Sequence, residues 1–174
     1  LRTIATPDGD SYLLNGEKWF VTGGDFATFL LVVAIVELDG QRLPTIFFVD
    51  RDAPGLSFTR KPRMTHAVIY GHPEVKLENV RIAKDMILGQ VGDGISLTQD
   101  WFREERLMIA ARCLGAAARC IELAHEFAEQ RVQFGTPIIE NQAIQWMLAD
   151  SAAELASAQA LPYKVTADIE SGVD

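Results

Sequence analysis

Three neighbouring side chains combine aromatic rings with a hydroxyl group at the end of a predicted strand. Trp19, Phe20 and Thr22 stand directly before a pair of glycines. Because side chains alternate along a strand, we expect Phe20 and Thr22 on one face and Trp19 and Val21 on the other. An aromatic ring beside a hydroxyl can stack on a flat heteroaromatic ligand and hydrogen-bond to it. The same residue types also serve in an ordinary strand core, so both interpretations are open.

A second candidate group follows a long predicted helix. Arg131, Gln133 and Phe134 bring a guanidinium, an amide and an aromatic ring to its exit. Arginine binds phosphate oxygens with paired hydrogen bonds. An arginine near a helix C-terminus also interacts favourably with the helix dipole, so these two interpretations stay open as well.

The third candidate is the pair Glu105 and Arg106, in the charge run of residues 103–106. This pair adjoins residues 107–118, which are apolar on nearly every side of a helix. A carboxylate partly removed from water at such a boundary can serve as a general base. The alternative is a solvated helix face.

Metal and phosphate motifs are missing from the sequence. His66, His72 and His125 are scattered and lack the spacing of metal ligands, so we expect no metal site. The sequence also contains no glycine-rich phosphate loop and no nucleophile elbow.

The helix that carries these groups is unusually long. Within residues 92–135 we expect a helix of about 38 residues without proline, or about 55 Å. Its apolar middle predicts cover from several neighbours, and Arg112, Arg119 and Glu126 trace one narrow polar line. Pro137 opens a second predicted helix at about residues 138–169, which Pro162 is expected to kink or end.

Residues 1–90 are predicted to form short strands. Residues 12–14 and 17–21 flank Asn15-Gly16, a strong hairpin signal. Further strands are expected at residues 29–36, 44–49, 56–61 and 75–80, the first of them buried on both faces. The sequence therefore predicts an α+β chain. A small antiparallel β-barrel or sandwich, residues 1–90, precedes a long antiparallel helical hairpin, residues 91–174, that is part of a helix bundle.

Composition limits the class of protein. The 174 residues are 48% hydrophobic and carry a net charge of −8, so we expect no nucleic-acid partner. Cys113 and Cys120, seven residues apart on one helix, cannot bridge each other and are expected as buried thiols in a reducing compartment. The apolar run 29–36 is too short to span a bilayer, and no signal peptide is visible. The start at Leu1, without methionine, predicts a fragment of a larger protein.

Several motifs together resemble the acyl-CoA dehydrogenases in order and spacing, over essentially the whole chain. The resemblance places residues 1–90 as the middle β domain and residues 91–174 as the N-terminal half of the C-terminal helical domain. The motifs are Asn15-Gly16-Glu17-Lys18-Trp19-Phe20-Val21-Thr22-Gly23, Asp52-Ala53-Pro54-Gly55, Leu77-Glu78-Asn79-Val80-Arg81-Ile82, Gly92-Asp93-Gly94, Glu105-Arg106, Arg131-Val132-Gln133-Phe134-Gly135, Gln142 and Ala149-Asp150.

The resemblance implies an FAD flavoprotein of fatty acid metabolism that oxidises an acyl-CoA across Cα–Cβ and passes the hydride to flavin N5. It implies a homotetramer or dimer of dimers, an electron-transfer flavoprotein as acceptor, and a bacterial cytoplasmic or mitochondrial matrix location, not a secreted one. Glu105 matches the base of some subfamilies, although most carry the base later in the helical domain, and Arg106 matches a substrate-site arginine. The implied cofactor-binding residues are Phe20, Val21, Thr22, Arg131, Gln133, Phe134, Ile138, Asn141 and Gln142.

Departures from the family pattern leave alternatives. Phe20 stands where the family usually has tryptophan, and residues 64–73 replace a glycine-containing, serine-rich loop, so acyl-chain preference stays open. An acyl-CoA oxidase or flavin monooxygenase of the same fold is the second interpretation, and a non-catalytic scaffold is the third. We expect no dehydrogenase activity from these 174 residues alone.

Overall fold

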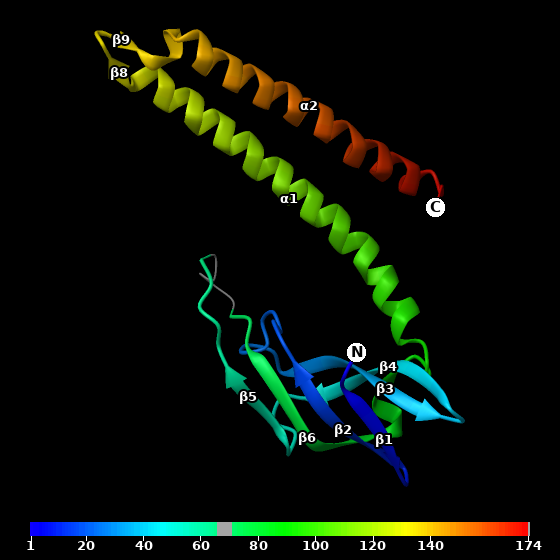
Figure 1. The fold of residues 1–174 in the computed structure, drawn as a ribbon. Helices are drawn as coiled ribbons and strands as arrows, with labels where there is room; N and C mark the ends of the chain where they lie inside the picture. Colours follow the sequence, from blue (N-terminus) through cyan, green and yellow to red (C-terminus); the bar gives the residue numbers. More distant parts are fainter. Residues whose placement is uncertain (66–70, 174) are drawn as a thin grey trace. The chain divides into compact units, whose positions relative to one another are not determined.

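The computed structural model describes residues 1–65 and 71–173. They fall into two compact units, Leu1–Asp100 and Trp101–Asp174, each described here by itself (Figure 1). Half of the atypical loop at residues 64–73 lies outside the described residues, so its effect on substrate choice stays a prediction.

A seven-stranded sheet forms the described part of the first unit. Neighbouring strands are antiparallel except β1 and β3, which are parallel. The spatial order is β5-β6-β2-β1-β3-β4-β7. The elements are β1 (Ile4–Asp8), β2 (Ser11–Lys18), β3 (Phe29–Leu38), β4 (Gln41–Asp50), β5 (Leu56–Arg60), β6 (Glu74–Ala83), the 3-10 helix η1 (Lys84–Met86) and β7 (Ile87–Leu88).

The parallel pair of β1 and β3 corrects the prediction of a wholly antiparallel sheet, although the α+β class is confirmed. The chain is α+β as expected, but its sheet is mixed and not wholly antiparallel. The reason is the connection at residues 19–28, which carries the chain from the end of β2 to the other side of β1. There β3 starts in the same direction as β1. The sequence pattern had not revealed β1.

One side of the sheet forms the core. Alternate positions on the long strands point inward, as the period of a half-buried strand requires. Tyr12 and Phe47 pack edge to face there, with ring centroids 5.3 Å apart. The buried cluster comprises Ala5, Tyr12, Leu14, Leu30, Val32, Ala34, Val36, Phe47, Val49, Val75, Leu77, Val80 and Ile82.

The predicted hairpin at Asn15-Gly16 is wrong. Both residues lie inside β2, and the turn between β1 and β2 lies at Gly9-Asp10. Gly16 marks an irregularity in the pairing of β2 with β6, and a Cβ there would lie 2.7 Å from Thr3 Cα. Asn15 Oδ1 accepts a 2.8 Å hydrogen bond from the backbone N–H of Asn79. The dipeptide thus serves a bulge and a close backbone approach, which are also typical roles of glycine in strands.

The strand at residues 29–36 is buried on both faces only toward its C-terminal end. Leu30 and Val32 point into the core, whereas Phe29 and Leu31 are half exposed. The first half of β3 therefore presents an apolar outer face, which corrects the expectation for the whole strand.

The Gly92-Asp93-Gly94 motif joins the sheet to the first helix. Gly92 N–H donates to Thr45 Oγ1 at 3.1 Å, and a Cβ at Gly94 would lie 2.7 Å from Pro44 O. Asp93 Oδ2 accepts from Gln90 N–H at 2.9 Å. Glycine at position 94 thus lets the start of the helix lie directly against β4.

Two long helices dominate the second unit. Helix α1 (Gly94–Gln130) has 37 residues, close to the predicted length. The strands β8 (Val132–Gln133) and β9 (Thr136–Pro137) and the 3-10 helix η2 (Ile138–Glu140) then reverse the chain. Helix α2 (Gln142–Glu170) runs antiparallel to α1 (Figure 1). It continues through Pro162, so the alternative that this proline ends the helix is wrong.

The helices are largely uncovered within this chain. Ala128 is the one apolar residue buried among the described helical residues, and Trp101, Met108, Phe127 and Trp146 are more than half exposed. Cys113 and Cys120 are free but exposed, which corrects the expectation of buried thiols. Their burial depends on whatever covers α1, and the expected helix bundle stays a prediction.

Candidate functional site

The segment after β2 presents its aromatic rings to the surface. Phe20 adopts φ of 56°, a left-handed conformation that ends the strand alternation after Lys18. Trp19 and Phe20 are 61% and 56% exposed, and their rings meet edge to face at 6.4 Å. Trp19, Phe20 and Val21 line the same cavity. The predicted separation of these residues onto opposite faces is therefore wrong, because it required an extended backbone at Phe20.

That cavity has a volume of about 240 Å³ and a nearly apolar lining. Leu30, Leu31 and Val33 of β3 contribute to it. The polar exception is Lys18, whose Nζ donates to Val33 O at 2.5 Å. Burial lowers the pKa of Lys18. The cavity offers an apolar contact surface beside the exposed ring of Phe20.

A backbone ladder fixes this segment. Val21 N–H donates to Pro73 O at 3.0 Å, and Gly23 N–H donates to Gly71 O at 3.1 Å. Between them the hydroxyl Oγ1 of Thr22, which is exposed, lies 3.0 Å from His72 Nδ1. Sequence reasoning considered His72 only as a metal ligand and missed this contact. The pairing of distant segments places it, and residue spacing carries no signal for that pairing.

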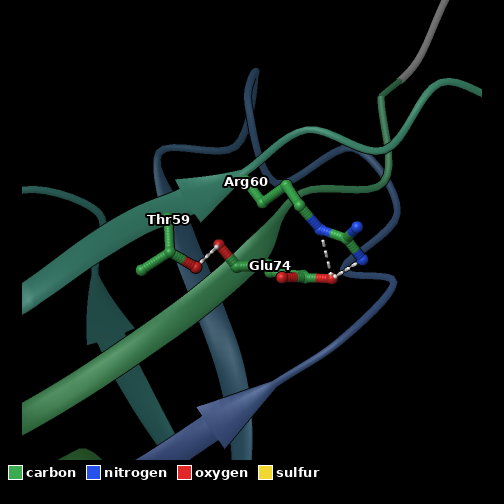
Figure 2. Close-up of polar contacts among 3 residues, drawn as sticks. All are labelled: Thr59, Arg60 and Glu74. Carbon is green, nitrogen blue, oxygen red and sulfur yellow. Dashed lines mark hydrogen bonds and ion pairs between the residues drawn. The ribbon is translucent and has the colours of Figure 1, made fainter.

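An ion pair borders the same segment on strands β5 and β6 (Figure 2). Arg60 donates from Nε and Nη2 to Glu74 Oε1, at 2.9 and 2.5 Å, and Thr59 Oγ1 donates to Glu74 O at 3.4 Å. The Arg60 guanidinium lies 6.0 Å from the centroid of the Trp19 ring. The buried carboxylate of Glu74 thus orients Arg60, and Arg60 contacts Trp19 through a cation–π interaction.

The second group of candidates lies on the turn between the helices. Phe134 and Gly135 both have positive φ, 53° and 89°, as a two-residue hairpin turn of type I′ requires. The Phe134 side chain is fully exposed at the tip. Ile138 N–H closes the turn by donating to Arg131 O at 2.8 Å. The sequence predicted where the helix ends but not this hairpin.

The polar residues of this turn face solvent. Arg131, Gln133, Asn141 and Gln142 are exposed, and among the described residues the Arg131 side chain has no ion-pair partner. Asn141 precedes α2, and its backbone carbonyl accepts from Ile144 and Gln145 N–H at 2.9 and 3.1 Å. An exposed guanidinium can bind a phosphate group, and an exposed aromatic ring can stack on a flat base.

Glu105 and Arg106 lie on α1 in the second unit. Glu105 is half-buried and Arg106 is exposed, with its guanidinium 5.7 Å from the Phe102 ring centroid. The structure thus groups Phe20, Val21 and Thr22 in one unit, and Glu105, Arg106 and the turn residues in the other. The roles that the sequence assigned to them stay predictions.

The described residues offer neither a cluster for a metal ion nor a helix suited to a membrane. They contain no group of three or more His, Cys, Asp or Glu side chains arranged to hold a metal ion. None of their helices combines the length and apolar character needed to span a membrane.

Comparison with known proteins identifies the family. The model of the acyl-CoA dehydrogenase middle domain matches residues 1–80, and that of the acyl-CoA dehydrogenase C-terminal domain matches residues 92–174. The chain belongs to the acyl-CoA dehydrogenase family. An acyl-CoA dehydrogenase of Bacillus subtilis (strain 168) is 35% identical over 164 residues, which are 94% of this chain and 43% of the relative. The chain thus spans less than half the length of the curated relatives it matches.

Solved structures of this family share the fold. A probable acyl-CoA dehydrogenase of Mycobacterium abscessus has a TM-score of 0.92 at 28% identity, covering 100% of this chain and 46% of its own. An acyl-CoA dehydrogenase of Bacillus anthracis complexed with FAD has a TM-score of 0.89 at 29% identity, covering 98% and 29%. The prolyl acyl carrier protein oxidase AnaB has a TM-score of 0.88 at 31% identity, covering 99% and 46%.

Proposed function

We propose that the complete protein is an FAD-dependent acyl-CoA dehydrogenase that removes hydrogen from Cα and Cβ of an acyl-CoA thioester. The observation that carries the proposal is the exposure of Phe20 and Thr22 beside an apolar cavity, at the positions that the family motif assigns to the flavin. Had these two side chains been packed into the sheet's own core, they could not meet a cofactor.

The residues present fit FAD in their chemistry. The Phe20 ring and the apolar wall formed by Leu31 and Val33 suit a flat ring system, and the Thr22 hydroxyl suits its polar edge. When bound, the flavin supplies the hydride acceptor. Phe20, Val21 and Thr22 would orient that ring.

The helical turn fits the other half of a dinucleotide. Arg131 is exposed and without an ion-pair partner among the described residues, so its guanidinium can pair with pyrophosphate oxygens. Phe134 offers a fully exposed ring, and Gln133, Ile138, Asn141 and Gln142 lie between the end of α1 and the start of α2 with it. We assign these six residues to the FAD of a neighbouring copy in the assembled protein.

Glu105 and Arg106 are assigned to the substrate. The Glu105 carboxylate accepts the α-proton of the thioester. Arg106 places its positive charge close to the substrate and to that carboxylate. A proton on a carbon next to a carbonyl leaves only when the developing negative charge on the thioester oxygen is stabilised. The competing assignment keeps Arg106 in place and takes the base from a later part of the helical domain.

The uncovered helices support an assembled protein. Large apolar side chains such as Trp101, Phe127 and Trp146 are more than half exposed, which supports burial against further helices and further copies of the chain. We assign a homotetramer or dimer of dimers, with an acyl-CoA as substrate and an electron-transfer flavoprotein as electron acceptor. The two free cysteines agree with a reducing compartment, the bacterial cytoplasm or the mitochondrial matrix.

An acyl-thioester oxidase is the second candidate. The similarity to the prolyl acyl carrier protein oxidase is as high as that to several dehydrogenases. The two activities differ in where the electrons go after the substrate is oxidised. Release of hydrogen peroxide in air, with no transfer to an electron-transfer flavoprotein, identifies the oxidase.

The direct test of the catalytic assignment is Glu105→Gln in the full-length protein, with Glu104→Gln as its neighbouring control. We expect Glu105→Gln to retain FAD and lose at least about 100-fold in turnover, equivalent to about 2.7 kcal/mol. Glu104→Gln is expected to stay near wild type because its side chain is exposed in the same charge run. Turnover of Glu105→Gln within about tenfold of wild type places the base elsewhere.

A further inference from the structure

Backbone pairing brings Thr22 and His72 face to face. The hydrogen bonds from Val21 N–H to Pro73 O and from Gly23 N–H to Gly71 O flank this pair on both sides. In an antiparallel arrangement, residues between two such bonds bring their side chains to the closest approach. Pro73 has no N–H to return a bond to Val21 O, and that carbonyl instead accepts from Gly24 N–H at 3.0 Å. The chain backbone, and not a chance rotamer, therefore sets the Thr22–His72 contact.

The contact itself has two hydrogen-bonding states. Thr22 Oγ1 and His72 Nδ1 are 3.0 Å apart. A hydroxyl has one proton to donate and lone pairs to accept with, and the Nδ1 of a neutral imidazole can donate or accept. When Nδ1 accepts, the hydroxyl proton is committed to His72, and Thr22 offers a lone pair outward. When Nδ1 carries the proton, it donates to Oγ1, and Thr22 offers its hydroxyl proton outward.

From this geometry we infer that His72 is a positioning residue that sets whether Thr22 donates or accepts a hydrogen bond at the bound cofactor. The inference rests on the proposed function, in which the Thr22 hydroxyl meets the polar edge of a flavin. A flavin ring nitrogen accepts a hydrogen bond before it takes up hydride and donates one afterwards. The Thr22–His72 pair can satisfy both states, because either tautomer of the imidazole completes the pair. A threonine with no such neighbour would have an unrestrained hydroxyl.

Three substitutions at position 72 in the full-length protein separate positioning from packing. His72→Asn places an amide near the position of Nδ1 and is expected to keep the bond to Thr22. His72→Gln carries its amide one carbon further, toward the position of Nε2, and His72→Ala removes the group. We expect His72→Ala and His72→Gln to weaken FAD binding about fivefold, the loss of one hydrogen bond of about 1 kcal/mol. His72→Asn is expected within about twofold of wild type.

The readouts are the dissociation constant of FAD, the absorption spectrum of the bound flavin and its reduction potential. Each variant is repeated in a Thr22→Val background. The His72→Ala effect is expected to vanish there, because the hydroxyl that His72 orients is gone. An undiminished loss of affinity in the Thr22→Val background shows that His72 acts through the fold and overturns the inference. If all three position-72 variants bind FAD as tightly as wild type, the inference is also overturned. The proposed function would then still stand. A wild-type protein that binds no FAD overturns both.

Discussion

Replacing Gly16 with alanine tests the close approach that holds β2, the strand that ends at Lys18 directly before Trp19. A Cβ at position 16 would lie 2.7 Å from Thr3 Cα and 2.9 Å from Thr3 Oγ1, and Thr3 is fully buried. Forcing atoms into a packed site costs about 1–3 kcal/mol. The φ of 146° adds roughly 1 kcal/mol for a residue with a side chain. We therefore expect Gly16→Ala to destabilise the protein by about 2–4 kcal/mol.

Gly9→Ala is the matched control, because Gly9 also has positive φ, 60°, but nothing lies within 4 Å of an added Cβ. It should cost only about 1 kcal/mol. Thermal unfolding of the full-length variants, followed by circular dichroism and by release of FAD, measures the difference. Equal shifts of the unfolding midpoint for both variants would refute the close-approach argument and leave only a general cost of alanine at positive φ.

Three further predictions concern the site and its frame. Phe20→Ala should weaken FAD binding about tenfold or more through lost stacking. The control is Leu38→Ala, at another half-exposed apolar residue of the sheet, which should leave the affinity unchanged. Equal affinities of the two variants would remove Phe20 from the cofactor site. Arg131→Gln should weaken FAD binding about tenfold and flatten its salt dependence, while Arg42→Gln, whose arginine pairs with Glu37 at 3.7 Å, should leave both unchanged. The hydrogen bond from Lys61 lowers the pKa of Asp25 below 3.8, so the pair's contribution is complete above that pH and is lost as pH falls through the folded-state value. The stability difference between wild type and Lys61→Met should accordingly stay constant above about pH 5 and shrink as the pH falls below about 3.8, and a difference that stays constant there would contradict the ionic origin.

Local periodicity gave most of the long elements, but it gave neither β1 nor the faces of the strands. The run without proline at residues 92–135 gave the long helix, observed at Gly94–Gln130. The apolar alternation gave the approximate positions of β3, β4, β5 and β6. The left-handed Phe20 could not be read this way, because alternation presumes an extended backbone and no glycine marks the position.

Features set by contacts between distant segments escaped the sequence. Asn15-Gly16 has the composition of a turn, yet the approach of Thr3 and the bond to Asn79 decide its role. The Thr22–His72 contact joins residues that are 50 positions apart. Cys113 and Cys120 were expected to be buried on the basis of residue type, but the described residues leave both thiols exposed.

Motif order was more informative than any single motif. Arg131, taken alone, is an arginine near a helix end, and the dipole explains it equally well. The structure adds that this side chain is exposed and that it precedes a turn whose tip carries the fully exposed ring of Phe134. Exposure of polar and aromatic groups at matched positions is what distinguishes a candidate cofactor site from an ordinary helix terminus.

The most direct measurement is an anaerobic titration of the purified full-length protein with acyl-CoA thioesters of different chain length, followed through the visible absorption of its bound flavin. We predict a yellow protein whose flavin absorption is bleached by at least one acyl-CoA and stays unbleached by the corresponding free fatty acid. A protein that carries no FAD after reconstitution, or one whose flavin is bleached by no thioester, would contradict the assignment.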